Sequence, residues 1–234
     1  MPDLSSFPIA RRWPARHPDR LQLYAAPTPN GVKVSIMLEE VGLAYEPHFV
    51  DISGNESKDP AFISLNPNGR IPAIIDPHGP GGRPIGVWES GAILVYLAEK
   101  TGQLIPTSPE ARYETLAWVF FQVSAIGPMF GQLGFFLRSG GQASENQRPL
   151  QRFATEAKRL LTVLDRQLDG RDWIVGDYSI ADVATLGWVN ALITSYDAGG
   201  LLEFESFANI SAWLKRGLAR PAAQRGLLVP EKTA

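Results

Sequence analysis

The sequence predicts an α/β domain followed by an all-helical domain. The uneven distribution of proline supports this, and so does the order of the elements in each part, described below. Of the 19 prolines, fifteen lie in residues 1–110 and four in the rest of the 234-residue chain. The first part is therefore built from short elements and turns, and the second from long helices. Hydrophobic residues make up 44% of the chain, which excludes disorder over most of its length. There is no cysteine, so any thiol chemistry must use a thiol that arrives with a ligand.

Charge and histidine spacing exclude two further classes of protein. The 22 basic and 24 acidic residues nearly balance, which removes any global argument for nucleic-acid binding. The three histidines, at positions 17, 48 and 78, are far apart in the sequence, and no two have the short spacing typical of metal ligands. We therefore expect no metal site. Residues 1–19 lack the apolar core of a secretory signal. We expect them to form a flexible arm and the protein to be cytoplasmic.

The first part of the chain predicts alternating strands and helices. Period-two patterns indicate strands, helical spacing of apolar residues ended by Gly42 or Gly102 indicates helices, and a Gly- and Pro-rich turn joins the last two strands. The predicted strands are 21–25, 45–52, 71–76 and 84–87, and the predicted helices are 32–41, 59–65 and 89–101. The order β-α-β-α-β-β-α is that of a thioredoxin-like domain.

The second part predicts long helices at 110–137, 149–168, 179–196 and 206–219. Ser179 and Asp182 form an N-capping pattern, and we interpret Asp182 as a structural cap rather than a catalytic acid. Residues 115–137 carry no charge and are long enough to span a bilayer. Gly127 and Pro128 would break such a span midway. We therefore expect a central helix of the helical domain and no membrane partner.

Four short runs occur in a fixed order along the chain: YAAPTPNG (24–31), NPNGRIPAI (66–74), WESGAILVYLAEKTG (88–102) and IGPMFGQ (126–132). Together they resemble the glutathione transferases, and within these the nu-class, Ure2p-like bacterial branch. The resemblance runs from about residue 20 to residue 228. It implies a thioredoxin-like glutathione-binding domain (20–102), a linker (103–109), an all-helical domain (110–234), glutathione as co-substrate and a homodimer.

The loop with Thr28 and Asn30 is the candidate catalytic element. It lies at the entry of a predicted helix, where unpaired N–H groups and the positive dipole end stabilise a thiolate. The residues alone favour a different interpretation, in which Asn30 only caps the helix and Thr28 only fills a turn. The resemblance implies that both contact the sulfur of glutathione. Tyr24 precedes the loop inside a strand, and we expect it to be a packing residue.

Two further segments carry the remaining glutathione contacts that the resemblance implies. The Ile71–Pro72 bond is expected to be cis, with the Ile71 main chain pairing with the cysteinyl part of glutathione and Arg70 binding its terminal carboxylate. At 89–90, a Ser hydroxyl at a helix N-terminus can bind a carboxylate and the adjacent Glu89 can accept an ammonium. That combination fits the γ-glutamyl zwitterion, although an ordinary capped helix has the same pattern.

The resemblance also implies that Arg152 reaches the glutathione site of the partner in the dimer; a surface arginine is the alternative. Ser57 stands where relatives have a glutamine that contacts glutathione, which puts that contact in doubt. The aromatic segment 130–136 is expected to border the second-substrate pocket. We expect a glutathione-dependent disulfide reductase. The alternatives are a conjugating or peroxidase transferase with the same site, or a regulatory binding protein without turnover.

Overall fold

The computed structural model describes residues 4–139 and 147–231 and contains two compact units. The first unit combines Met1–Thr101 with Pro221–Ala234, and the second is Gly102–Arg220. The elements of the first unit are α1 (Ile9–Arg12), β1 (Leu21–Ala25), α2 (Pro29–Val41), β2 (Tyr45–Phe49), η1 (Glu56–Lys58), α3 (Pro60–Leu65), β3 (Ala73–Asp76), η2 (Pro80–Gly82), β4 (Ile85–Trp88), α4 (Ser90–Thr101) and α10 (Pro221–Gly226).

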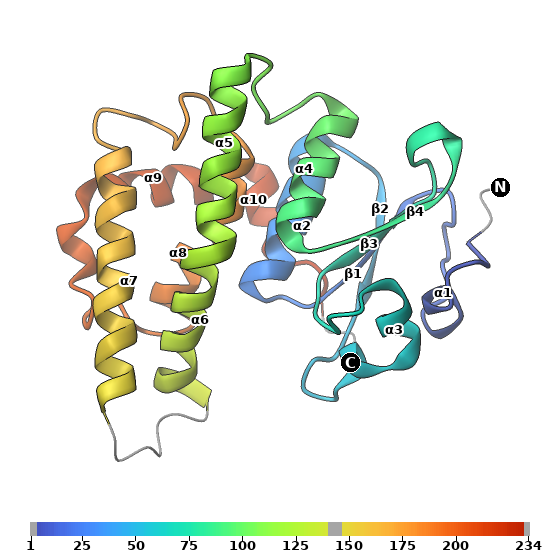
Figure 1. The fold of residues 1–234 in the computed structure, drawn as a ribbon, viewed down its shortest axis with the longest axis horizontal. Helices are drawn as coiled ribbons and strands as arrows, with labels where there is room; N and C mark the ends of the chain where they lie inside the picture. Colours follow the sequence, from blue (N-terminus) through green and yellow to red (C-terminus); the bar gives the residue numbers. More distant parts are fainter. Residues whose placement is uncertain (1–3, 140–146, 232–234) are drawn as a thin grey trace. The chain divides into compact units, whose positions relative to one another are not determined.

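The first unit is built on a four-stranded mixed sheet with the order β2-β1-β3-β4 (Figure 1). β1 is parallel to β2 and antiparallel to β3, and β3 is antiparallel to β4. The strands and helices follow the β-α-β-α-β-β-α order, so the thioredoxin-like prediction is confirmed. The second strand ends at Phe49 rather than at 52, and the third begins at Ala73 rather than at 71.

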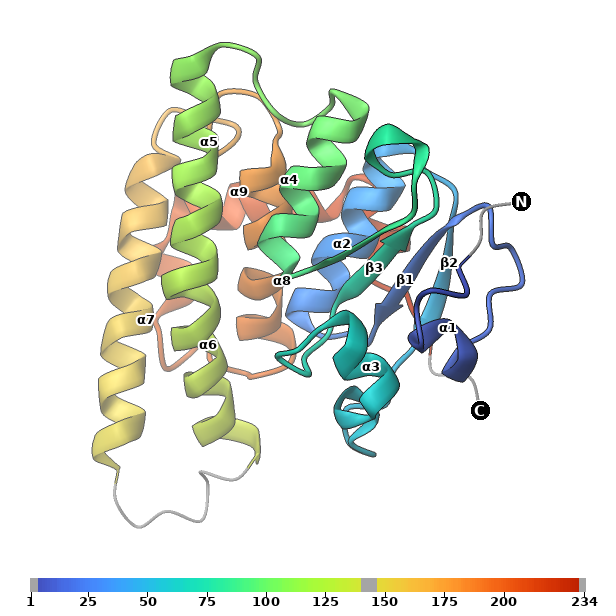
Figure 2. The same cartoon turned by 45° about the vertical axis from the view of Figure 1, so that its right-hand side comes forward.

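Helices cover both faces of this sheet. α2 and α4 pack against each other on one face, and α3 contacts α1 on the other (Figure 2). Successive strand residues point to opposite faces, so Tyr24, Ala73 and Ile75 pack with Phe62 of α3, while Leu23 and Ile74 are fully buried on the α2 and α4 side.

The N-terminal segment is packed rather than flexible, which corrects the expectation for residues 1–19 over their described part. Ile9 of α1 is fully buried in the cluster with Tyr24 and Phe62. The Glu46 carboxylate accepts hydrogen bonds from the main-chain N–H groups of Arg16 (2.8 Å) and His17 (2.7 Å). Leu4 and Ile9 are buried in this cluster, and Phe7 and Trp13 pack against it; burial of these side chains holds the segment in place.

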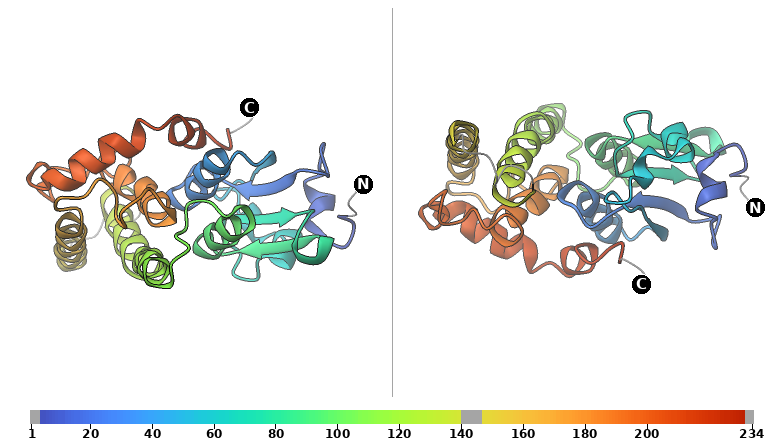
Figure 3. Two further views of the ribbon diagram at one scale, coloured as in Figure 1. Left: turned by 90° about the horizontal axis from the view of Figure 1, so that it is seen from above. Right: turned by 90° about the horizontal axis from the view of Figure 1, so that it is seen from below.

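The last helix of the chain also differs from the expected boundaries, which assigned residues 110–234 to the helical domain. α10 packs on α2 of the first unit, beside it in Figure 3. The Ser35 hydroxyl donates to the Gly226 carbonyl (2.6 Å), and the Arg225 guanidinium pairs with Glu39 (2.6 Å). A Cβ on Gly226 would lie 2.6 Å from the Ile36 main chain, so only glycine allows this close approach.

The second unit is helical. Its elements are α5 (Pro109–Phe121), η3 (Gln122–Ile126), α6 (Gly127–Gly134), η4 (Phe135–Ser139), α7 (Arg148–Gln167), α8 (Ile180–Thr194), η5 (Phe204–Ser206) and α9 (Ala208–Leu218). The η3 and η4 segments are π-helical. Pro128, at the start of α6, has no N–H to donate to the preceding turn. The wider π-helical turn before it accommodates this, so the helix continues where the sequence suggested a break.

Asp182 of α8 acts as the structural cap predicted for it. Its carboxylate accepts from the main-chain N–H groups of Ile174 and Ser179 (both 3.0 Å) and from the Trp213 indole (2.8 Å). Burial raises the pKa of Asp182, and these hydrogen bonds oppose that shift. The continuous run Pro109–Arg138 is long and apolar enough to cross a membrane by length and composition alone. The core helix of a helical domain passes the same test, and this run contacts α7 and α8.

Candidate glutathione-type site at one edge of the sheet

Three segments of the first unit meet at one edge of the sheet. Ala73 at the start of β3 pairs with Tyr24 near the end of β1 and with Trp88 at the end of β4. The chain just after β1, just before β3 and just after β4 therefore lies at the same end of the three strands. These are the segments with Thr28 and Asn30, with Ile71 and Pro72, and with Glu89 and Ser90.

The first of these segments enters α2 directly, and the helix begins at Pro29 instead of 32. Thr28 is the N-cap: its hydroxyl oxygen accepts a hydrogen bond from the Gly31 N–H (3.3 Å). Pro29 suits the first helical position because it lacks the N–H that would be unsatisfied there. Asn30 is thus inside the first turn, half-buried, and is not the cap. A Cβ on Gly31 would collide with the Ala26 carbonyl oxygen, which explains a glycine in this loop.

The second segment is held by side chains from the preceding loop. The Ile71–Pro72 peptide bond is cis, as the resemblance implies. Ile71 stands two residues before β3, so its main-chain groups lie beyond the ladder with β1 and β4. The Asn66 amide donates to the Arg70 carbonyl (2.5 Å), and the Lys58 ammonium donates to the Gly69 carbonyl (2.7 Å). The Arg70 side chain is exposed.

The third segment combines an exposed acid with a buried hydroxyl. Glu89 has a positive φ of 69°, a conformation that non-glycine residues adopt rarely and that recurs at functional sites. Ser90 opens α4 and is 6% exposed. Its hydroxyl accepts a hydrogen bond from the amine of Lys33 (3.1 Å). Burial lowers the pKa of Lys33 to about 7, although the charge of Glu89 raises it in part.

Tyr24 is the packing residue that the sequence predicts. Its ring is fully buried, stacks on His48 at 4.7 Å between ring centroids, and meets the edge of Trp13. Within the described residues its hydroxyl has no hydrogen-bond partner. Burial, and secondarily the charge of Glu46, raise the pKa of Tyr24. A phenol in this environment is a poor source of a phenolate.

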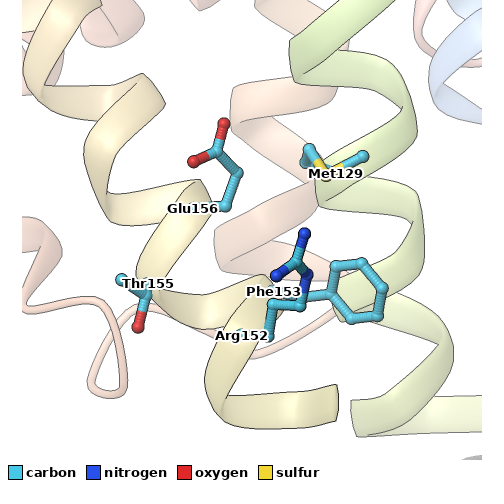
Figure 4. Close-up of a pocket in the computed structure, with 5 residues that line it drawn as sticks. All are labelled: Met129, Arg152, Phe153, Thr155 and Glu156. Carbon is cyan, nitrogen blue, oxygen red and sulfur yellow. The ribbon is translucent and has the colours of Figure 1, made fainter.

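Arg152 lies in the other unit, on α7, and is exposed. It lines a cavity of about 460 Å³ together with Met129, Phe153, Thr155 and Glu156 (Figure 4). Phe136 stacks on Phe153 at 5.6 Å between centroids, Phe135 is 47% exposed, and Phe130 is fully buried. The aromatic segment 130–136 thus contributes both core and surface.

Sequence reasoning missed three residues that shape the sheet edge. Lys33 is a polar position in the first helix of the sheet unit's β-α-β pattern, yet it is 1% exposed. A lone lysine inside the apolar run 32–38, three residues after Asn30 and hence on the same helix face, was the available signal. Lys58 and Asn66 donate hydrogen bonds to main-chain carbonyls. Every residue has such a carbonyl, so the sequence gives no pattern that would predict these contacts. Ser57, at the position of the missing glutamine, is buried.

Among the described residues, no group of three or more His, Asp or Glu side chains could hold a metal ion.

Comparisons with known proteins agree on one family. The model of the glutathione S-transferase N-terminal domain matches residues 19–99, and that of the C-terminal domain matches residues 127–221. The disulfide-bond oxidoreductase YfcG of Escherichia coli is 39% identical over 89% of this chain and 94% of its own length.

Two solved structures extend this similarity. A glutathione transferase from Burkholderia graminis, with two glutathione molecules bound per subunit, has a TM-score of 0.98 and 58% identity over 100% of this chain and 98% of its own. One from Pseudomonas putida, with one glutathione disulfide bound per subunit, has a TM-score of 0.96 and 56% identity over 97% of this chain and 99% of its own.

Proposed function

The chain belongs to the glutathione S-transferase family, and on that premise we propose that it is a nu-class, glutathione-dependent disulfide reductase. The observation that carries the proposal is the meeting of three segments at one sheet edge in a chain without cysteine. The protein then supplies orientation and anion stabilisation, and both reacting sulfurs belong to ligands.

The proposed step is thiol–disulfide exchange between two bound molecules. The thiolate of glutathione attacks the glutathione sulfur of a mixed disulfide, so that a new S–S bond forms as the old one breaks. Glutathione disulfide forms, and the second sulfur leaves as a thiolate that takes a proton from water. Two relatives each bind two glutathione units per subunit, as two molecules in one and as glutathione disulfide in the other. A site with two neighbouring glutathione positions is what this exchange needs.

Thr28 and Asn30 are proposed to stabilise the attacking thiolate. Thr28 already uses its oxygen as the acceptor for Gly31, which leaves its O–H as a donor toward a ligand. Asn30 is not the N-cap and lies in the first turn of α2, where its side-chain amide would donate to the sulfur. Both lie at the positive end of the helix dipole, which favours a negative charge.

The rest of glutathione is proposed to extend along the same edge. The main chain of Ile71 before Pro72 would pair with the cysteinyl part, as in the addition of a strand to a sheet. Ser90 and the N-terminus of α4 would bind the α-carboxylate of the γ-glutamyl group, and Glu89 its ammonium. The exposed Arg70 would pair with the glycine carboxylate.

We also propose a homodimer in which Arg152 contributes to the partner's site. Tyr113 and Phe120 of α5 are 71% and 66% exposed and lie seven residues apart on one helix face, which gives α5 an apolar surface suited to a second copy. Analytical ultracentrifugation at micromolar protein tests this. A monomer with full activity would remove both the dimer and the role of Arg152.

A turnover assay with three substrates separates the candidate activities. The purified protein is given glutathione with a small disulfide, an aryl halide or a hydroperoxide, in a cytosol-like buffer that matches the proposed cytoplasmic location. We expect the disulfide to turn over at least tenfold faster than the other two. Faster conjugation or peroxide reduction would replace the reductase, and binding without any turnover would indicate a regulatory protein.

A further inference from the structure

The buried amine of Lys33 touches the proposed ligand-binding hydroxyl but has no place in the proposed exchange. Its Nζ lies 3.1 Å from Ser90 Oγ, and both residues are buried, at 1% and 6% exposure. Lys33 is one helical turn beyond Asn30 on α2, while Ser90 opens α4. The contact therefore joins the helix whose N-terminus is proposed to stabilise the glutathione sulfur to the helix whose N-terminus is proposed to bind the γ-glutamyl end.

We propose that Lys33 is a positioning residue that sets the direction in which the Ser90 hydroxyl donates; this inference rests on the proposed glutathione site. An ammonium has three donors and no acceptor, so Ser90 Oγ must accept from it and the Ser90 proton turns toward the ligand carboxylate. A neutral amine has a lone pair. The neutral amine can accept a hydrogen bond from the Ser90 hydroxyl. Ser90 Oγ then points a lone pair at the ligand carboxylate, which weakens binding.

Burial and one nearby charge act on the protonation of Lys33. Burial lowers its pKa to about 7, and Glu89 is the charged group that acts against this. α10 brings Arg225, but this side chain is paired with Glu39. Glu99 and Lys100 lie at the far end of α4, and β1 carries no charged residue. Asp76 of β3 is paired with Lys100.

The direction of the pH effect follows from linkage. A ligand carboxylate that binds better when Lys33 is an ammonium must raise the pKa of Lys33 by the same factor. The ligand's own ammonium opposes this in part, because it neutralises Glu89. We expect the ligand carboxylate to change the pKa of Lys33 more than the ligand ammonium does, because the carboxylate and Lys33 both hydrogen-bond to the Ser90 hydroxyl. Affinity then falls as the pH rises through about 7.

Calorimetry with S-methylglutathione tests the inference, because this probe has no thiol that could titrate. We expect the association constant to fall by several-fold, up to about tenfold, between pH 6 and pH 8, because tenfold is the limit for one linked proton with a pKa near 7 in the free protein. Lys33→Met should abolish this slope. Lys215→Met, on the exposed part of α9, is the matched control and should keep it.

Each result decides between the claims. A wild-type slope that persists in Lys33→Met, or no slope in either protein, overturns the role of Lys33 and leaves the glutathione site standing. If the wild type binds no S-methylglutathione at any pH, the proposed function fails as well. If Lys33→Met does not fold, Ser90→Ala replaces it: weak binding with little slope supports the inference, and a full slope contradicts it.

Discussion

Tyr24→Phe and Asn30→Ala together decide which group activates the thiol. The two residues lie on either side of the turn between β1 and α2, but only Asn30 is at the helix N-terminus. If the thiol is stabilised by the helix end, the phenol of Tyr24 is dispensable and the amide of Asn30 is not.

The structure sets the size of both effects. The Tyr24 hydroxyl is buried without a hydrogen-bond partner among the described residues, and such a group costs about 1–3 kcal/mol. Its removal should therefore raise the free energy of unfolding by about 1 kcal/mol, or the Tm by about 2–4 °C for a chain of this size. Removing Asn30 should lower the rate about tenfold. That is less than the 10²–10³ typical of oxyanion-hole donors, because sulfur is a weaker acceptor and the helix N-terminus remains.

The assay is the initial rate of glutathione-dependent reduction of a small disulfide, with thermal unfolding measured on the same samples. Asn30→Asp serves as a size-matched control that removes the donors and adds a repelling charge, so its rate should fall further than that of Asn30→Ala. Loss of activity in Tyr24→Phe together with an unaffected Asn30→Ala would mean that a tyrosine hydroxyl activates the thiol. The nu-class assignment would then be wrong, while the family would stand.

Three further predictions concern single side chains. Ser90→Ala should weaken glutathione binding by about 1.5–3 kcal/mol, the value of a hydrogen bond to a charged group; unchanged affinity by calorimetry would contradict the carboxylate site. Asp182→Ala should lower the free energy of unfolding by at least about 3 kcal/mol, because three buried N–H donors lose their acceptor; urea titration measures this, and a loss below 1 kcal/mol would refute the cap. For Asp76, burial alone would raise the pKa, but the hydrogen bonds from Lys100, Tyr96 and the His78 N–H lower it below 3.8. Its contribution to stability is therefore present above that pH and lost below it, so the gap in unfolding free energy between wild type and Asp76→Asn should close on acidification, and a constant gap would contradict the ion pair.

Local patterns were enough to predict the sheet, its flanking helices and the cap at Asp182. Each of these depends on neighbouring residues: alternation in a strand, helical spacing of apolar residues, or a capping box. The start of α2 was misplaced by three residues because Pro29 and Gly31 look like turn residues. They are in fact a proline at the first helical position and a glycine under a carbonyl.

Features that depend on distant parts of the chain could not be predicted. The N-terminal segment is held by Glu46, some thirty residues away, and by packing on Tyr24 and Phe62. Its helix is only four residues long, which is too short to give a periodic pattern in the sequence. The burial of Lys33 depends on Ser90, 57 positions later. The candidate site was found mainly through the resemblance, since Thr28, Ile71 and Glu89 come together only when the strands pair.

The packing of α10 on α2 has a consequence for how the protein is made. The first unit needs residues from both ends of the chain, and the bond between Ser35 and Gly226 spans 191 positions. The helical unit is continuous in the sequence, whereas the side of α2 that α10 covers stays open until Pro221–Gly226 has been made. Closing so long a loop is slow compared with local helix formation. We therefore expect ribosome-stalled chains that end before Pro221 to expose α2 to proteases, and released chains to protect it.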